Sequence, residues 1–270
     1  MIVQKAIAFF RRDLQIESSY KLAFVFEAMT TLFPLLTLYF IAKLMSPTAA
    51  DPRLAPYGGA YFPFAVIGLA FTQYFMTALT NFAGTIRRSQ MAGCLEAMLS
   101  TRTPPGTVIL LSSVYSFVAK LFHLVMVLAA SWLLLGVDFS RCNWLSAGVT
   151  LVLTVMGFSG LGILSAAFII VMKKGDPVEW LVGALGSLLG GALFPVAVMP
   201  QWLQSISALL PTTYALEAMR LAMLKGHSLW MLRVDLAVLL ATAIVLLPVS
   251  VWMFSKAVER GRRDGTLMHY

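Results

Sequence analysis

Glu27 and Lys120 are the charged side chains that fall well inside long apolar stretches of this 270-residue sequence. A charge at the centre of a bilayer costs roughly 2.5 kcal/mol or more, so such residues mark ion-coupling sites or ion pairs. Glu27 follows Lys21 by about 9 Å along a helix of about 1.5 Å rise, and His123 lies one turn from Lys120. We expect Glu27 and Lys120 to pair near the cytoplasmic leaflet. The alternative is that Lys120 extends to the headgroups while Glu27 faces an N-terminal helix.

Side chains of catalytic type form no recognisable site elsewhere. The sequence has no G-x-x-x-x-G-K-[S/T] to cradle nucleotide phosphates, no H-E-x-x-H and no G-x-S-x-G. The three histidines, His123, His227 and His269, lack the spacing of metal ligands, and Cys94 and Cys142 form no ligand pair. The sequence therefore predicts neither an enzyme nor a metal or cofactor bound to this chain.

The composition places these residues in a membrane protein. Hydrophobic residues make up 59% of the chain and charged residues 12%, against about 45–50% and about 25% in soluble domains. Crossing ~30 Å of hydrocarbon takes roughly 20 apolar residues. We therefore expect one all-α integral membrane domain, residues 1–270, with six transmembrane helices. The qualifying windows are Leu22–Ala42, Tyr61–Ala83, Val108–Gly136, Trp144–Met172, Trp180–Met199 and Leu232–Phe254.

Lysine and arginine are distributed unevenly between the two sets of flanking segments. Thirteen lie in the set that includes both termini, and six lie in the opposite set. Because cytoplasmic loops carry the excess of positive charge, we expect both termini in the cytoplasm. The net charge of +8 then reflects topology and contact with anionic lipid, and no nucleic-acid partner is predicted.

Two amphipathic segments lie on the predicted cytoplasmic side. Residues 1–21 carry an apolar stripe, which predicts an interface helix in the headgroup plane; a basic topogenic tail is the alternative. Residues 84–105 carry Met91, Leu95, Met98 and Leu99 on one helical face, and the pair Pro104–Pro105 ends that helix. We call residues 84–105 the coupling segment, and we expect a soluble partner to contact it.

The connection between the fifth and sixth windows, residues 200–226, predicts two short helices on the outer side. Trp202 and Ile206 share a face between two prolines, and about ten residues give only ~15 Å of helix, too little to cross. A second helix is predicted from about Thr213 to Leu224, with Gly226 as its cap. We expect a re-entrant hairpin; an external loop with two surface helices is the alternative. Upstream, small residues in the fifth window indicate close helix packing, within one chain or between two.

These segments together resemble the membrane subunit of ABC-2 type transporters over nearly the whole chain. The family has a G-T-L-E-x-L-L-x-T-P-like motif between its second and third spans. Here G-C-L-E-A-M-L-S-T starts at Gly93, with Cys94 in place of threonine and Arg102–Thr103 inserted before the proline. The more specific match is L-P-T-T-Y-A-L-E-A-M-R, which starts at Leu210 and is preceded by F-P and M-P.

The resemblance implies a permease of a bacterial cytoplasmic (inner) membrane that pairs with itself or with a paralogous permease. It implies docking of two cytoplasmic P-loop ATPase subunits, which would hold ATP and magnesium. The positions that match the docking elements are Arg11, Arg12, Arg87, Arg88, Met91, Gly93, Leu95, Glu96 and Leu99. The positions that match an external gate are Trp202, Pro211, Thr212, Tyr214, Glu217 and Arg220. Glu217 and Arg220, three residues apart, are expected to form a local ion pair.

The external motif looks closer to drug and lipid exporters than to polysaccharide permeases, whose equivalent segment more often begins Asn-Pro. Spans rich in Phe, Leu and Met also favour a hydrophobic or amphipathic substrate. One alternative is export of a lipid-linked polysaccharide, O-antigen or teichoic acid. Alternatives of other classes are an ion-coupled secondary transporter that uses Glu27 and Lys120, and a membrane scaffold that moves no cargo.

Overall fold

The structure is a computed structural model that describes residues 11, 15, 21–45, 52–91, 93, 105–172 and 177–263. Within these ranges every regular element is a helix. The α-helices are α2 (Lys21–Met45), α3 (Tyr61–Met91), α5 (Pro105–Leu135), α6 (Trp144–Met172), α7 (Pro177–Leu189), α8 (Gln201–Ser207), α9 (Pro211–Leu224) and α10 (Arg233–Arg263); the short 3-10 helices are η1 (Ala55–Tyr57) and η2 (Val196–Val198).

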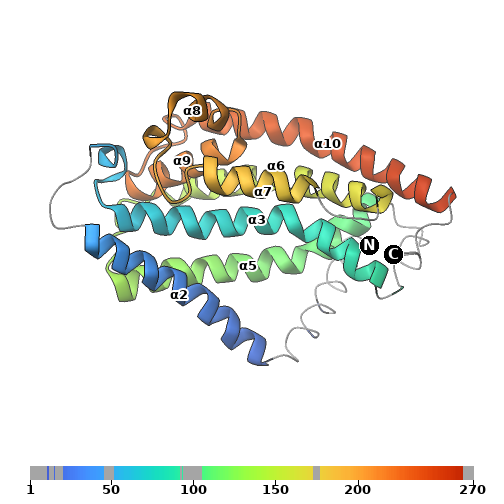
Figure 1. Ribbon diagram of the computed structural model, residues 1–270, viewed down its shortest axis with the longest axis horizontal. Coiled ribbons are helices and arrows are strands. Elements are labelled where there is room, and N and C mark those ends of the chain that lie inside the picture. Colours follow the sequence, from blue (N-terminus) through green and yellow to red (C-terminus); the bar gives the residue numbers. More distant parts are fainter. Residues whose placement is uncertain are drawn as a thin grey trace.

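The long helices run side by side, and α6 makes extensive contacts with both α10 and α3 (Figure 1). Gly162 of α6 explains the close approach to α3, because a Cβ there would overlap the main-chain oxygen of Leu79. Gly160 likewise faces Leu246 of α10. Small residues let membrane helices pack closely, and aromatic rings fill the remaining space: Phe75 and Phe158 stack with their centroids 5.6 Å apart.

In the part of the chain that the structure describes, four helices are long and apolar enough to cross a membrane: Tyr61–Met91, Gly106–Leu135, Trp144–Met172 and Arg233–Gly261. They confirm four of the six predicted windows as apolar helices. Two shorter apolar helices, Leu32–Leu44 within α2 and Val178–Leu189 within α7, fall below that length. A first and a fifth span therefore stay predictions, as does the six-span topology.

The fifth predicted window, Trp180–Met199, is wrong as one continuous helix. The helix α7 ends at Leu189, and the chain turns at Gly190 and Gly191, whose φ is +75°. Only glycine adopts that backbone conformation without strain. The chain then continues through η2, which starts after Pro195. Hydropathy alone missed this break because the residues after the turn remain apolar.

The predicted boundary between the second span and the coupling segment is also displaced. The helix α3 continues without a break from Tyr61 to Met91, beyond the expected end at Ala83. It continues because Ile86, only 4% exposed, belongs to an apolar cluster with residues of α6 and α10. Gly93 closes this stretch with φ of +66°, and its N–H donates to the carbonyl of Gln90. Pro105, the last residue of the coupling segment, begins α5. Residues 92 and 94–104 of that segment, and all of the interface helix 1–21 except residues 11, 15 and 21, lie outside the described residues.

The two short helices predicted between the fifth and sixth windows are present as α8 and α9. The helix α9 begins at Pro211, which occupies its first turn. Its residues Ala215, Leu216, Ala218 and Met219 are almost completely buried, so α9 is not a surface helix. By contrast, Ser207 is the one buried residue of α8. The α5–α6 connection also holds α9, because the N–H of Asn143 donates to the carbonyl of Ala222 at 2.9 Å.

Candidate functional site

Arg220 of α9 is buried between three segments of the chain, with only 2% of its surface exposed. Its Nε donates to the carbonyl of Phe64 at 3.2 Å, and one terminal nitrogen donates to the carbonyl of Ala192 at 2.6 Å. The guanidinium carbon lies 3.5 Å from the centre of the Phe64 ring. A buried charge is tolerated where it is hydrogen-bonded. Arg220 therefore connects α9 to the start of α3 and to the turn that follows α7.

Tyr57 of η1 extends this arrangement to the α2–α3 connection. Its hydroxyl donates to the Glu217 carboxylate at 2.5 Å, and its ring lies 4.9 Å from the ring of Phe64. Burial, and then the nearby Glu217 carboxylate, raise the pKa of Tyr57 well above its ordinary value. We call Tyr57, Phe64, Ala192, Glu217 and Arg220 the Arg220 cluster.

The expected local ion pair between Glu217 and Arg220 is wrong in its geometry. Arg220 lies on the buried face of α9 and donates to main-chain carbonyls, whereas Glu217 is half-buried and accepts from Tyr57. The two charges still attract each other electrostatically. Gly68 of α3 leaves the necessary space, since a Cβ there would overlap the Arg220 guanidinium and the Ala192 oxygen.

Hydrogen bonds connect α7, α8 and α9 close to the other predicted gate residues, although two of the three donors, Ser207 and Thr213, were not among those predicted. The Ser207 hydroxyl donates to the carbonyl of Leu189 at 2.5 Å, and the Thr213 hydroxyl donates to the carbonyl of Ser207 at 2.7 Å. Tyr214 donates to the carbonyl of Ala208 at 2.8 Å. Pro211 starts α9, while Trp202 of α8 is 66% exposed and stands apart from the Arg220 cluster.

Thr212 packs against the glycines of α7 from within the same chain. Its side chain is 3% exposed and lies beside Gly186 and Gly190, where an added Cβ would be 3.0 Å from a carbon of Thr212. This contact explains Gly186 and Gly190 by packing within one chain, one of the two alternatives that the sequence left open.

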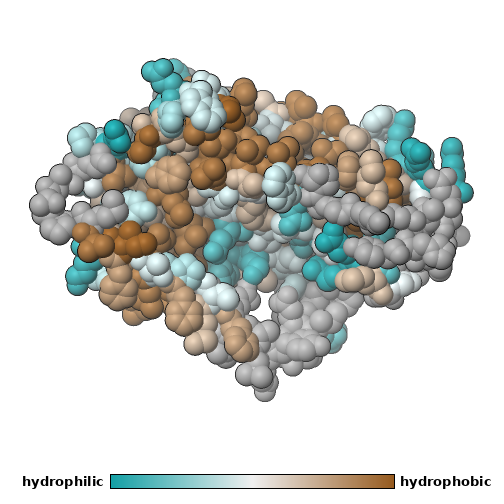
Figure 2. All heavy atoms as spheres, viewed as in Figure 1, coloured by the Kyte–Doolittle hydropathy of each residue, from teal (hydrophilic) through white to brown (hydrophobic). Residues whose placement is uncertain are grey.

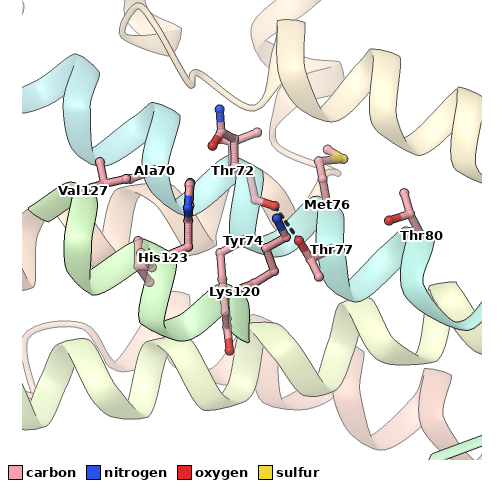
Figure 3. Close-up of a pocket in the computed structure, with 11 residues that line it drawn as sticks. Ala70, Thr72, Tyr74, Met76, Thr77, Thr80, Lys120, His123 and Val127 are labelled. Atoms are coloured by element: carbon pink, nitrogen blue, oxygen red, sulfur yellow. Dashed lines mark hydrogen bonds between the residues drawn. The ribbon is translucent and has the colours of Figure 1, made fainter. Parts of the chain in front are cut away.

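A cleft of about 330 Å³ opens between α3 and α5 (Figure 3). Polar side chains of α3 line it, namely Thr72, Gln73, Thr77 and Thr80, together with Lys120 and His123 of α5; the remaining lining residues are Ala70, Tyr74, Met76, Leu124 and Val127. Figure 2 shows hydrophilic residues at this place, between hydrophobic surfaces on either side. Polar groups therefore gather halfway along helices that are otherwise apolar.

A second cavity of about 570 Å³ lies between α3 and α7. Met76 and Thr80 line both cavities, so the two adjoin along one face of α3. The second one is completed by Glu179, Trp180, Gly183 and Ala184 of α7. We call the two cavities together the α3 groove. Its combined lining is mixed polar and apolar, as in sites that bind small molecules.

Lys120 is half-buried and lines the same cleft as His123, which confirms that the two residues share a face of α5. Glu27 belongs to α2, but its side chain lies outside the described part of the structure, so the Glu27–Lys120 pair stays a prediction. Among the described residues, no group of three His, Cys, Asp or Glu side chains could hold a metal ion.

A family model described as ABC-2 type transporter matches residues 7–224. The chain belongs to the ABC-2 type transporter family. Similar known proteins are the inner membrane transport permease YadH of Escherichia coli and that of Shigella flexneri. Each is 29% identical over 188 residues, which cover 68% of this chain and 71% of the relative. The family match covers α3, both cavities of the groove and α9.

The predicted docking residues of this ABC-2 permease that the structure describes gather mostly at the end of α3. Arg87 is half-buried, Met91 is 67% exposed, and Arg88 is exposed with its guanidinium 3.3 Å from the Thr85 hydroxyl. Arg11 is also exposed. Gly93 follows the helix as its cap. Arg12, Leu95, Glu96 and Leu99 lie outside the described residues.

Sequence reasoning missed several residues of both sites. Gln73, Thr77 and Thr80 recur at helical spacing within an apolar window, and this polar stripe was a signal that could have located the α3 groove. Tyr57 gave no comparable signal, because its bond to Glu217 joins residues far apart in sequence.

Proposed function

We propose that this ABC-2 permease is one half of an ATP-driven exporter. It forms the translocation path for a hydrophobic or amphipathic compound, as a dimer with a second copy or a paralogous permease. Two cytoplasmic P-loop ATPase subunits bind ATP with magnesium and drive the cycle. Both termini lie in the cytoplasm, and similarity to an inner membrane transport permease supports a place in a bacterial inner membrane.

The observation that carries this proposal is the α3 groove. It places Lys120, His123 and Gln73 on the outer surface of a single chain, halfway along helices that are otherwise apolar. Exposure of such groups to lipid tails is costly, and they are found facing a bundle interior or a water-filled cavity. A second permease that covers this face would convert the groove into an enclosed path.

The helix α3 offers a route for coupling. Its first residues contact Arg220 through the carbonyl of Phe64, its middle lines the α3 groove, and its far end carries Arg87 and Arg88 (Figure 1). An ATPase that moves the Arg88 end therefore acts on a single rigid element that reaches both the groove and the Arg220 cluster. This connection supports export driven by the closure of the ATPase dimer.

The decisive experiment is a pull-down of the tagged permease from its native membranes in gentle detergent. We expect a P-loop ATPase at a ratio of two to two. The charge reversals Arg88→Glu and Glu96→Lys should remove it, whereas Arg233→Glu, a reversal at an exposed position at the start of α10, should retain it. Recovery of the permease alone, under conditions that preserve other ATPase complexes, would contradict the proposal.

An ion-coupled secondary transporter is the second candidate, because Lys120 belongs to an apolar helix and its side chain lines a cavity. It predicts transport that follows a proton or sodium gradient and stops with Glu27→Gln or Lys120→Met. The exporter predicts transport that needs ATP and survives collapse of both gradients. Vesicles that contain the permease and its ATPase distinguish these outcomes directly. Export of a lipid-linked polysaccharide is the remaining alternative within the ABC-2 class.

A further inference from the structure

We propose that the α3 groove recognises cargo by an anionic head, a carboxylate or a phosphate, held at Lys120 and His123. This inference rests on the proposed function and specifies its substrate class as amphiphiles that join an acidic head to an apolar tail. Lys120 and His123 lie one turn apart on α5, and both line the cleft that faces α3.

The charge of the cleft sets the preferred head. Among the described residues that line the α3–α5 cleft, Lys120 carries the one formal charge and His123 is a second basic group. The bound head takes the place at Lys120 that the sequence prediction gave to Glu27. An ammonium that donates to an anionic oxygen in a partly dehydrated cleft makes a strong, charge-assisted hydrogen bond. A cationic head would instead meet a like charge. The cleft therefore favours acids over amines of the same shape.

Hydroxyl and amide groups of α3 complete the head site. Gln73, Thr77 and Thr80 line the cleft opposite Lys120. The hydroxyl oxygen of Thr72 is buried and has no hydrogen-bond partner among the described residues. A buried polar atom of this kind normally has a partner, and an oxygen of a bound head supplies one. This observation is independent of the charge of Lys120.

The adjoining cavity suits the apolar part of the ligand. Trp180, Gly183 and Ala184 of α7 line it, and Met76 joins it to the head site. Glu179 lies in the first turn of α7 at this second cavity, so a second anion there is repelled. The ligand is thereby oriented with its acidic head at Lys120 and its tail toward α7.

The test compares two fluorescent probes on the purified permease in phosphatidylcholine nanodiscs, with empty nanodiscs as the blank. The probes are dansylaminoundecanoic acid and its uncharged methyl ester. We expect the acid to bind more tightly than the ester. Lys120→Gln should weaken acid binding about tenfold, the size of one charge-assisted hydrogen bond, and should leave the ester unchanged. Lys120→Arg should retain the preference for the acid.

Lys256→Gln is the matched control, since Lys256 is exposed on α10 with its ammonium 4.2 Å from the Trp252 ring. Equal binding of acid and ester, equal loss of both probes in Lys120→Gln, or an equal effect of the two lysine variants would overturn the inference. Phosphatidylglycerol added to the nanodiscs tests whether the site binds cargo or an anionic lipid of the bilayer. We expect the acid probe to bind still. If phosphatidylglycerol displaces the acid probe, the site belongs to bilayer lipid and the cargo role is overturned. Because this binding needs no ATPase, its failure is distinguishable from failure of the exporter proposal.

Discussion

The Arg220 cluster and the α3 groove both place polar groups in a largely apolar protein, but they differ in what satisfies those groups. In the cluster, protein atoms surround Arg220, which is 2% exposed, with carbonyls at 2.6 and 3.2 Å and an aromatic ring at 3.5 Å from its guanidinium. In the groove, polar side chains border open space, and the Thr72 hydroxyl has no partner in the described part of the chain. The comparison separates a region that stabilises the fold from one that can accept a ligand.

Arg220→Met should have the largest effect on stability. It leaves the buried Ala192 carbonyl without its side-chain donor and removes a second hydrogen bond, to the Phe64 carbonyl; a buried unpaired group costs about 1–3 kcal/mol and a lost bond to a charged group a similar amount. We expect a loss of about 3 kcal/mol in the free energy of unfolding, measured by SDS titration of the purified protein. Arg233→Met is the control, because exposed Arg233 lies over the Trp230 ring at 5.0 Å. If Arg220→Met and Arg233→Met lower the free energy of unfolding equally, the buried contacts of Arg220 contribute nothing to stability.

Tyr57→Phe should have an intermediate effect. It removes a hydrogen bond to the Glu217 carboxylate, and bonds to charged groups contribute about 1.5–3 kcal/mol. Tyr214→Phe removes a bond to the neutral carbonyl of Ala208 and should cost about 1 kcal/mol. If Tyr57→Phe lowers the free energy of unfolding by less than Tyr214→Phe does, the Arg220 cluster has no special stabilising role.

The raised pKa of Tyr57 adds a pH test of the same contact. Its folded-state pKa lies above the ordinary value of 10.0, so its contribution to stability is fully present below that pH. The contribution is lost as the pH rises and the unfolded state ionises first. Wild type should therefore lose more stability than Tyr57→Phe between neutral and strongly alkaline pH. If the free energy of unfolding depends on pH in the same way in the two proteins, the pKa of Tyr57 is not raised in the folded state.

Thr72→Val should have the smallest effect on stability. The substitution removes a hydroxyl that has no hydrogen-bond partner among the described residues, so we expect a change within about 0.5 kcal/mol, or a slight gain. Thr213→Val makes the same chemical change where the hydroxyl donates at 2.7 Å, and it should cost about 1 kcal/mol. A large loss for Thr72→Val would assign the groove a role in holding the fold.

The sequence predicted those elements that depend on composition within one segment. The windows of α3, α5, α6 and α10 were found because each is a long apolar run, and α8 and α9 were found because prolines delimit them. The end of α7 was missed because Gly191 turns the chain within residues that remain apolar. The end of α3 was displaced because contacts with other helices, through Ile86, extend it.

For the sites, single residues were predictable and their partners were not. Arg220 and Glu217 were identified, yet their hydrogen bonds reach Phe64 and Tyr57, which lie more than 150 positions away. Lys120 was identified as an intramembrane charge, but the cleft that it lines depends on how α3 packs beside α5. Such long-range arrangements follow from tertiary packing, which local spacing does not encode.

The exposed face of α8 makes this helix a suitable site for a label. Trp202 is 66% and the following Leu209 is 83% exposed, while α9 is anchored separately by Arg220 and by the Asn143 N–H. A short epitope placed in α8 therefore leaves the anchors of α9 in position. Antibody access to that epitope on intact and permeabilised cells would establish directly which side of the bilayer this end of the molecule faces.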